Sequence, residues 1–188
     1  MRFRYLALLA SMFVGAPLLT ACDDNGLLGT LLLSPDTAVI GLPGGTVAEG
    51  SALDIVRSAG DFDLVRNPEL VTDAEQWDLA LRRTPTGLAL LPFTPVASSL
   101  RGAGIATTTR AFDAIDKAPR GNSSYSSQPV PVTAGGVYLL RSRQFSTSGL
   151  LCVKYARLRV VEVNEAAGTV RFAIVINEGC DDERLKND

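Results

Sequence analysis

Short apolar runs separated by Gly, Pro, Ser and Asn characterise the chain from about residue 38 onward. The clearest pattern lies near the C-terminus, where residues 152–163 and 169–180 are both rich in β-branched and aromatic side chains. Such runs predict strands, and the five residues between them, Asn-Glu-Ala-Ala-Gly, are typical of a hairpin connection. Further strands are predicted at residues 51–56, 62–65, 77–82, 87–92 and 137–143.

The register of the C-terminal hairpin follows from its loop. Centring the loop on Ala166 gives one face that is apolar in its middle, charged towards its open end and closed by two cysteines. Directly opposed residues have Cβ atoms roughly 4.5–5.5 Å apart, which suits a disulfide. We therefore predict a Cys152–Cys180 bond, the alternative being two free buried thiols. The predicted pairs are Val163–Thr169, Val160–Phe172, Leu158–Ile174, Lys154–Glu178 and Cys152–Cys180.

One stretch, residues 107–118, predicts a helix, because Phe112 and Ile115 are three positions apart and Pro119 would end it. Regular short strands with Gly and Pro turns otherwise predict an all-β fold. We expect an antiparallel β-sandwich-like single domain with one short helix.

We expect that domain to occupy residues 37–180. Residues 22–36 would form a tether before it, although residues 27–33 are apolar enough to dock on the domain as a strand instead. Residues 181–188 begin with Asp-Asp-Glu and predict a charged, solvated C-terminal tail.

Residues 1–21 have the features of a secretory signal, with two early arginines and an apolar run shorter than the roughly 20 residues of a membrane span. The next feature, Leu-Thr-Ala-Cys at residues 19–22, resembles the lipobox of bacterial lipoproteins. This resemblance implies cleavage before Cys22, acylation of its thiol and amine, and anchoring of the protein to a membrane of the bacterial cell envelope. The implied location is the outer membrane, the cell surface or the periplasmic face. The alternatives are an ordinary signal peptide with an incidental cysteine and an uncleaved anchor.

Charge and cysteine content change this picture in two ways. The whole chain has 18 basic and 20 acidic residues, and loss of residues 1–21 would remove two of the basic ones. The remaining excess of acidic residues argues against a nucleic-acid partner. With Cys22 taken by lipid, Cys152 and Cys180 remain as a pair in an oxidising compartment.

The available chemistry is limited, because the chain has no histidine and both methionines lie in the signal segment. Ser-His-Asp and Cys-His sites are therefore excluded, and we expect no enzyme and no metal site. Asp61 and Asp63 would share a strand face, as a weak cation site or, as we expect, a solvated edge. Asp113 and Asp116 could share a face of the predicted helix, where a polar surface is the simpler interpretation.

Five short strand motifs occur over roughly residues 60–176: Phe-Asp-Leu-Val at 62–65, Trp-Asp-Leu-Ala-Leu-Arg at 77–82, Val-Tyr-Leu-Leu-Arg at 137–141, Lys-Tyr-Ala-Arg-Leu at 154–158 and a final strand at 169–176. Together these motifs resemble the HmuY-like family of bacterial surface lipoproteins. The resemblance implies an all-β haemophore-like fold, in which haem is captured between two axial His or Met side chains. The mature chain has neither residue, so no haem ligand carries over.

These features favour a non-catalytic binding module at the envelope, for haem or another hydrophobic ligand. Tyr125 lies in a Ser- and Pro-rich loop and could ligate ferric haem, although an exposed loop aromatic is the interpretation that we favour. Trp77 lies on an alternating strand and is expected in the core. The alternative function is a structural or assembly lipoprotein that binds a partner protein and no small ligand. An enzyme with a carboxylate- or lysine-based site would be the third possibility.

Overall fold

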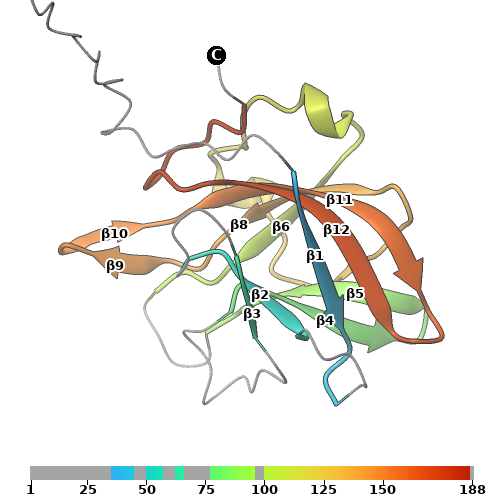
Figure 1. The fold of residues 1–188 in the computed structure, drawn as a ribbon. Helices are drawn as coiled ribbons and strands as arrows, with labels where there is room; N and C mark the ends of the chain where they lie inside the picture. Colours follow the sequence, from blue (N-terminus) through green and yellow to red (C-terminus); the bar gives the residue numbers. More distant parts are fainter. Residues whose placement is uncertain (1–34, 45–49, 57–61, 66–76, 96–99, 187–188) are drawn as a thin grey trace, which may run out of the picture.

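The computed structural model describes residues 35–44, 50–56, 62–65, 77–95 and 100–186. Two five-stranded sheets and one separate two-stranded hairpin make up this part of the chain (Figure 1), and every strand pair is antiparallel. The first sheet has the order β1-β12-β11-β8-β6, the second has the order β3-β2-β4-β5-β7, and β9 pairs with β10. The all-β prediction is therefore confirmed. The strands are β1 (Asp36–Gly41), β2 (Ala52–Asp54), β3 (Asp63–Val65), β4 (Leu79–Thr84), β5 (Gly87–Pro92), β6 (Gly104–Thr108), β7 (Val130–Pro131), β8 (Val137–Arg141), β9 (Phe145–Thr147), β10 (Leu150–Cys152), β11 (Tyr155–Asn164) and β12 (Thr169–Asn177).

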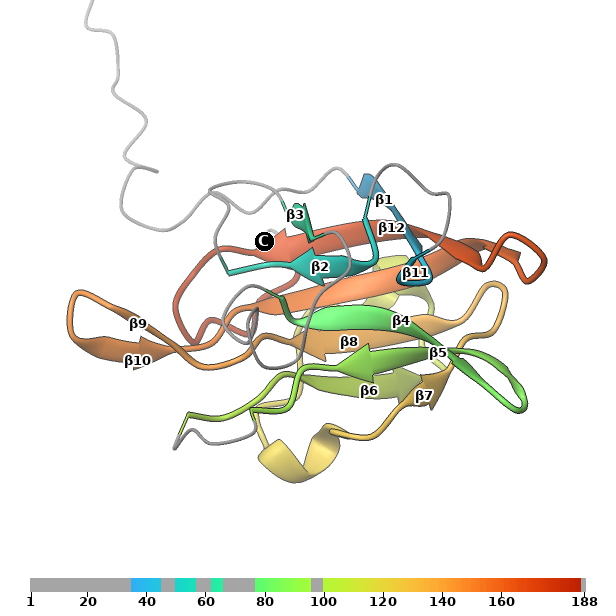
Figure 2. The same ribbon diagram turned by 90° about the horizontal axis from the view of Figure 1, so that it is seen from below.

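The two larger sheets overlie each other (Figure 2). They share one apolar core, as expected for a β-sandwich. Alternate residues of each strand point inward, so that Leu158 of β11 and Phe172 of β12 meet Leu81 of β4 and Leu90 of β5 in a single cluster. Trp77 is also buried, as predicted, and its ring meets Phe93 edge-on at 5.2 Å between centroids. Among the described residues, no helix is long and apolar enough to cross a membrane.

The C-terminal hairpin has the predicted register in its middle and a different one near its loop. Val160 lies opposite Phe172 as predicted, and Leu158 lies opposite Ile174. A bulge between Val160 and Glu162 then shifts the register, so Val163 pairs with Val170 rather than with Thr169. The predicted Val163–Thr169 pair is therefore wrong, because one extra residue on β11 is absorbed before the turn.

The open end of the same hairpin also differs from its prediction. The ladder stops at the Tyr155–Asn177 pair, so the predicted strand 152–163 is divided and Lys154 does not pair with Glu178 in the sheet. The two cysteines lie beyond this point and are nevertheless joined, with Cα atoms 5.2 Å apart. The predicted disulfide is confirmed, although it links the end of β10 to the segment after β12 rather than two positions of one ladder.

The predicted helix at residues 107–118 is wrong. Its first two residues belong to β6, and only Phe112–Ala114 form a single 3-10 turn, η2. The Arg157 side chain donates hydrogen bonds to the carbonyl oxygens of Phe112 and Ile115, at 2.8 and 3.0 Å. The Arg157 guanidinium thus occupies carbonyl oxygens that, in a continuing helix, would accept hydrogen bonds from backbone N–H groups of the next turn. A second 3-10 turn, η3, spans Asn122–Ser124.

The described part of the C-terminal segment packs on the domain. Leu185 is fully buried, and its N–H donates to the carbonyl oxygen of Asp116 at 2.7 Å. The Asn177 amide donates to the carbonyl oxygens of Asp182 and Arg184. Residues 181–186 therefore close the first sheet at its end rather than forming only a solvated tail.

Candidate functional site

The hairpin of β9 and β10 projects beyond both larger sheets (Figures 1 and 2). Its strands are joined by the two-residue turn Ser148-Gly149, whose φ angles of 49° and 81° are those of a type I′ turn. The turn places Thr147 opposite Leu150 and Phe145 opposite Cys152. The strands predicted from the sequence do not include this hairpin, although Ser-Gly between two strand-like runs is a signal for one.

Two large apolar side chains lie exposed on this hairpin. Leu150 is 67% exposed and Leu151 is 53% exposed; within the part of the chain that the structure describes, Val161 on β11 is the other large hydrophobic residue that is exposed. Because neighbouring residues of a strand point to opposite faces, the two leucines cover both faces of the ribbon. Residues 144–153, Gln-Phe-Ser-Thr-Ser-Gly-Leu-Leu-Cys-Val, include no charged side chain. An exposed apolar tip of this kind is typical of an interaction site.

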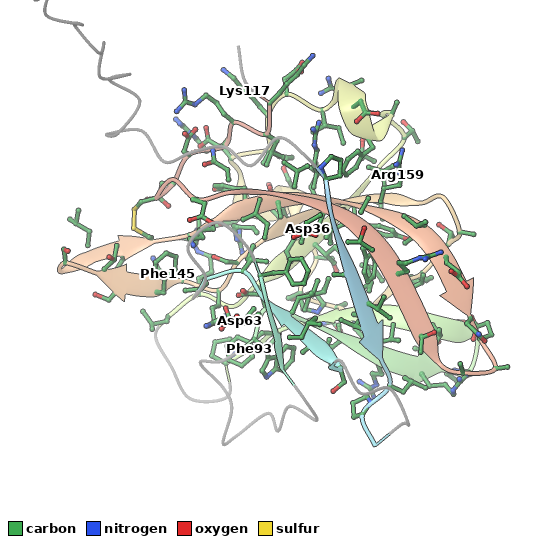
Figure 3. The ribbon with its side chains drawn as sticks, in the orientation of Figure 1. Asp36, Asp63, Phe93, Lys117, Phe145 and Arg159 are labelled. Atoms are coloured by element: carbon green, nitrogen blue, oxygen red, sulfur yellow. A yellow bond between two sulfur atoms is a disulfide. The ribbon has the colours of Figure 1, made fainter. Side chains whose placement is uncertain are left out.

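The base of the hairpin is held by several hydrogen bonds and by the disulfide, which is the yellow bond in Figure 3. The Ser142 N–H donates to the Lys154 carbonyl oxygen at 2.9 Å, and the Lys154 N–H donates to Ser142 Oγ at 2.8 Å. On the β10 side, Val153 and Asp181 exchange two hydrogen bonds, next to the Cys152–Cys180 bond. On the β9 side, the Gln144 N–H donates to the Arg101 carbonyl oxygen at 2.7 Å. The tip is therefore presented by a fixed support rather than by a loose loop.

A buried ion-pair cluster continues this support into the core. The Arg143 guanidinium donates to both carboxylate oxygens of Asp54 at 3.0 Å and lies 3.1 Å from Asp78 Oδ1. Asp78 Oδ1 also accepts the Arg143 N–H at 2.7 Å, and Asp78 Oδ2 accepts the Ile55 N–H at 2.9 Å. All three charged residues are at least 95% buried. The cluster thus fixes the start of the hairpin to β2 and to the entry of β4.

Burial and the neighbouring charges of the cluster shift the pKa values of Asp78 and Arg143. Burial raises the pKa of Asp78 to about 6 from the ordinary 3.8; Arg143 opposes the rise and Asp54 adds to it. Although burial acts to lower it, the pKa of Arg143 is raised by Asp78 and Asp54. Asp78 therefore gains a proton at a pH where an exposed aspartate is ionised.

We expect the free energy of unfolding to fall as the pH rises from about 4 to about 6. The folded protein binds a proton at Asp78 in this window and the unfolded chain largely does not. The stability from this group is therefore fully present below pH 3.8 and is lost as the pH rises through about 6. A shift of this size corresponds to about 3 kcal/mol. In Asp78→Asn this fall should be absent, whatever the variant's overall stability. Urea melts at pH 4, 5 and 6 measure it, and an equally steep fall in the variant would contradict the assignment.

Tyr125 belongs to a small buried cluster, with Leu139 and Tyr155, that is separate from the core between the sheets. Tyr125 is 9% exposed, and its ring centroid lies 5.0 Å from the Arg141 guanidinium carbon and 6.4 Å from the centroid of the tilted Tyr155 ring. The favoured interpretation as an exposed loop aromatic is therefore wrong. Among the described residues its hydroxyl has no hydrogen-bond partner, and burial raises its pKa. This environment disfavours the phenolate that would bind ferric iron.

The other predicted site residues are dispersed. Cys22 and Asp61 lie outside the described residues, and Asp63 pairs with Asp54 across β3 and β2. Asp113 is exposed in the middle of η2, whereas Asp116 forms exposed ion pairs with Arg110 and Lys186 at 3.8 and 3.6 Å. Within the described ranges, no group of three His, Cys, Asp or Glu residues could hold a metal ion.

Comparisons with family models, with curated proteins and with solved structures found no match for this chain. The resemblance to the HmuY-like family, and what it implies for function, therefore stays a prediction.

Proposed function

We propose that the protein is a membrane-anchored envelope lipoprotein that acts as a non-catalytic binding module for a hydrophobic ligand. The lipobox-like Leu-Thr-Ala-Cys at residues 19–22 supports the anchor, and the Cys152–Cys180 disulfide supports an oxidising compartment outside the cytoplasm. The contact element in this proposal is the β9–β10 hairpin.

The observation that carries the proposal is the exposure of Leu150 and Leu151 on a rigidly held, uncharged hairpin. Exposed leucines are ordinary when single and surrounded by charge, but two at a projecting tip form a surface that gains free energy when covered. The fixed base means that little conformational entropy is lost when that surface is covered.

The hairpin supports this proposal better than Tyr125 supports haem capture. The Tyr125 hydroxyl is buried beside Arg141, and no neighbouring His or Met exists in the mature chain to provide a second axial ligand. A hydrophobic ligand at the hairpin needs neither group, because apolar contact alone would hold it.

Replacement of the anchor residue tests the localisation. In Cys22→Ala, the protein should leave the washed membrane fraction and should no longer incorporate radiolabelled palmitate, because the acyl attachment site is gone. Asp24→Asn is the matched control: it lies two positions away and should fractionate and label as the parent does. Fractionation of both variants, followed by immunoblotting, gives the result. Parent-like membrane retention and labelling of Cys22→Ala would refute lipid anchoring.

A further inference from the structure

We infer that the hydrophobic ligand of the β9–β10 hairpin is the lipid surface itself: the tip inserts Leu150 and Leu151 into the interface of the bilayer that anchors Cys22. The inference rests on the proposed function for the anchor and adds a second, structural contact with the membrane. It would fix how the domain stands on the bilayer rather than leaving it free on its tether.

Leu150 and Leu151 lie on opposite faces of the two-stranded ribbon. In the β9–β10 register, Leu150 shares a face with Phe145 and Cys152, whereas Leu151 shares the opposite face with Ser146. A flat protein surface could cover one of these faces and would leave the other in water. A bilayer interface surrounds a projecting tip and covers both, so it accounts for both exposed side chains.

The tip of the hairpin is apolar and polar in composition but uncharged. Charged side chains are costly at membrane depth, and residues 144–153 have none, although charged residues make up 20% of the chain. The charged residues at either side, Arg143 and Lys154, are 5% and 7% exposed and are turned into the domain. Ser146, Thr147 and Ser148 bring hydroxyls that suit the headgroup region. The outward N–H and C=O groups of a two-stranded ribbon limit insertion to that region, where water and headgroups can bind them.

The chain enters the domain close to the strand end that carries the hairpin. β1 begins at Asp36 opposite Ile174, three residues before β12 ends, and the disulfide then joins the segment after β12 to β10. The N-terminal segment therefore enters the domain near the end of β12 that is linked to the β9–β10 hairpin. From Cys22 to Asp36 the chain can span at most about 50 Å. The ten-residue strand β11 measures roughly 33 Å. The anchor can thus place the hairpin against the bilayer without strain.

The base of the hairpin is rigid. The disulfide, the Ser142–Lys154 hydrogen bonds and the Arg143–Asp54–Asp78 cluster hold both strands of the hairpin where they leave the domain. A rigid element transfers the orientation of its tip to the whole domain, which a mobile loop would not do.

Tryptophan scanning in vesicles tests this inference. The full-length lipidated protein is reconstituted into phosphatidylcholine vesicles, with and without lipids brominated on their acyl chains, as the variants L150W and V161W. Val161 is the matched control, because it is an apolar, 49% exposed residue at the other end of the first sheet. The only native tryptophan, Trp77, is buried and gives the same background in both variants. In L150W we expect a blue-shifted emission and loss of intensity with brominated lipid, and neither change in V161W.

The outcomes separate the inference from the proposal on which it rests. Equal, unquenched emission from both variants in protein that remains with the vesicles would overturn insertion and leave the anchor standing. A blue shift in L150W without bromine quenching would also overturn it, since the tip would then be covered by protein. Failure of the anchor is detected separately by the fractionation of Cys22→Ala. Matching far-ultraviolet circular dichroism and melting of both variants verifies that the added indoles leave the fold intact.

Discussion

Replacing Arg143 with methionine should lower the free energy of unfolding at pH 7 by about 3–5 kcal/mol, because it leaves two buried carboxylates without their cation. Asp54 and Asp78 are 1% and 0% exposed, so water cannot take the place of the guanidinium. Methionine fills much of the same volume, so the loss reports the charge rather than a cavity. Urea or guanidinium denaturation of the parent and the variant measures the difference.

Arg83→Met is the control for this experiment. Arg83 pairs with Glu165 at 3.4 Å, but both side chains are about half exposed, at 49% and 53%. An exposed pair contributes at most about 1 kcal/mol, so this variant should melt close to the parent. The difference between the two variants isolates the effect of burial, and an Arg143→Met loss as small as that of Arg83→Met would contradict the role assigned to the cluster.

The loss of unfolding free energy in Arg143→Met should also depend on pH. Since burial already raises the pKa of Asp78 to about 6, loss of the opposing cation should raise it more. The carboxyl is then neutral in acid, and a neutral buried carboxyl costs less than an ionised one. The destabilisation should therefore be smaller at pH 4 than at pH 7, a pattern that simple misfolding of the variant would not give.

The parts of the fold that the sequence predicts correctly depend on local patterns. The period-two alternation at residues 77–82 and the β-branched runs around residue 158 and residue 172 determine strands wherever they lie in the chain. The pairing of Leu158 with Ile174 and the Cys152–Cys180 bond follow from the same short-range hairpin, because its loop is only a few residues long. The tight β9–β10 turn was also readable in principle, from Ser148-Gly149.

The parts that the sequence does not predict depend on contacts between distant residues. Asp54 and Arg143 are 89 positions apart, and nothing near either residue marks them as partners. The 107–118 stretch has helical spacing, yet Arg157 from the sheet binds its carbonyl oxygens and stops the helix after one turn. Tyr125 stands among polar loop residues but is buried by Arg141 and Tyr155. In each case tertiary contacts override the local signal.

Removing the disulfide should have the second large effect. In the double variant Cys152→Ala/Cys180→Ala the free energy of unfolding should fall by about 3–4 kcal/mol, as chain entropy gives for a cross-link over 28 positions. Reduction of the parent breaks the same bond and should give a similar loss, whereas reductant should leave the double variant unchanged. A variant as stable as the parent would contradict a structural role for the bond. Labelling of both cysteines by an alkylating agent without reductant, seen by mass spectrometry, would contradict the bond itself.

The loss should also be uneven across the molecule, and this connects stability to the proposed contact surface. The Cys152–Cys180 bond joins β10 to the segment after β12, and the other links at that point are hydrogen bonds such as those between Val153 and Asp181. Without the disulfide, amide exchange should rise most in residues 145–152 and least in the β4–β5 pair, which belongs to the second sheet and pairs with neither β10 nor β12. If the hairpin orients the domain on the bilayer, bromine quenching of L150W should become weaker in the same variant, because a loosened base no longer holds the tip in position.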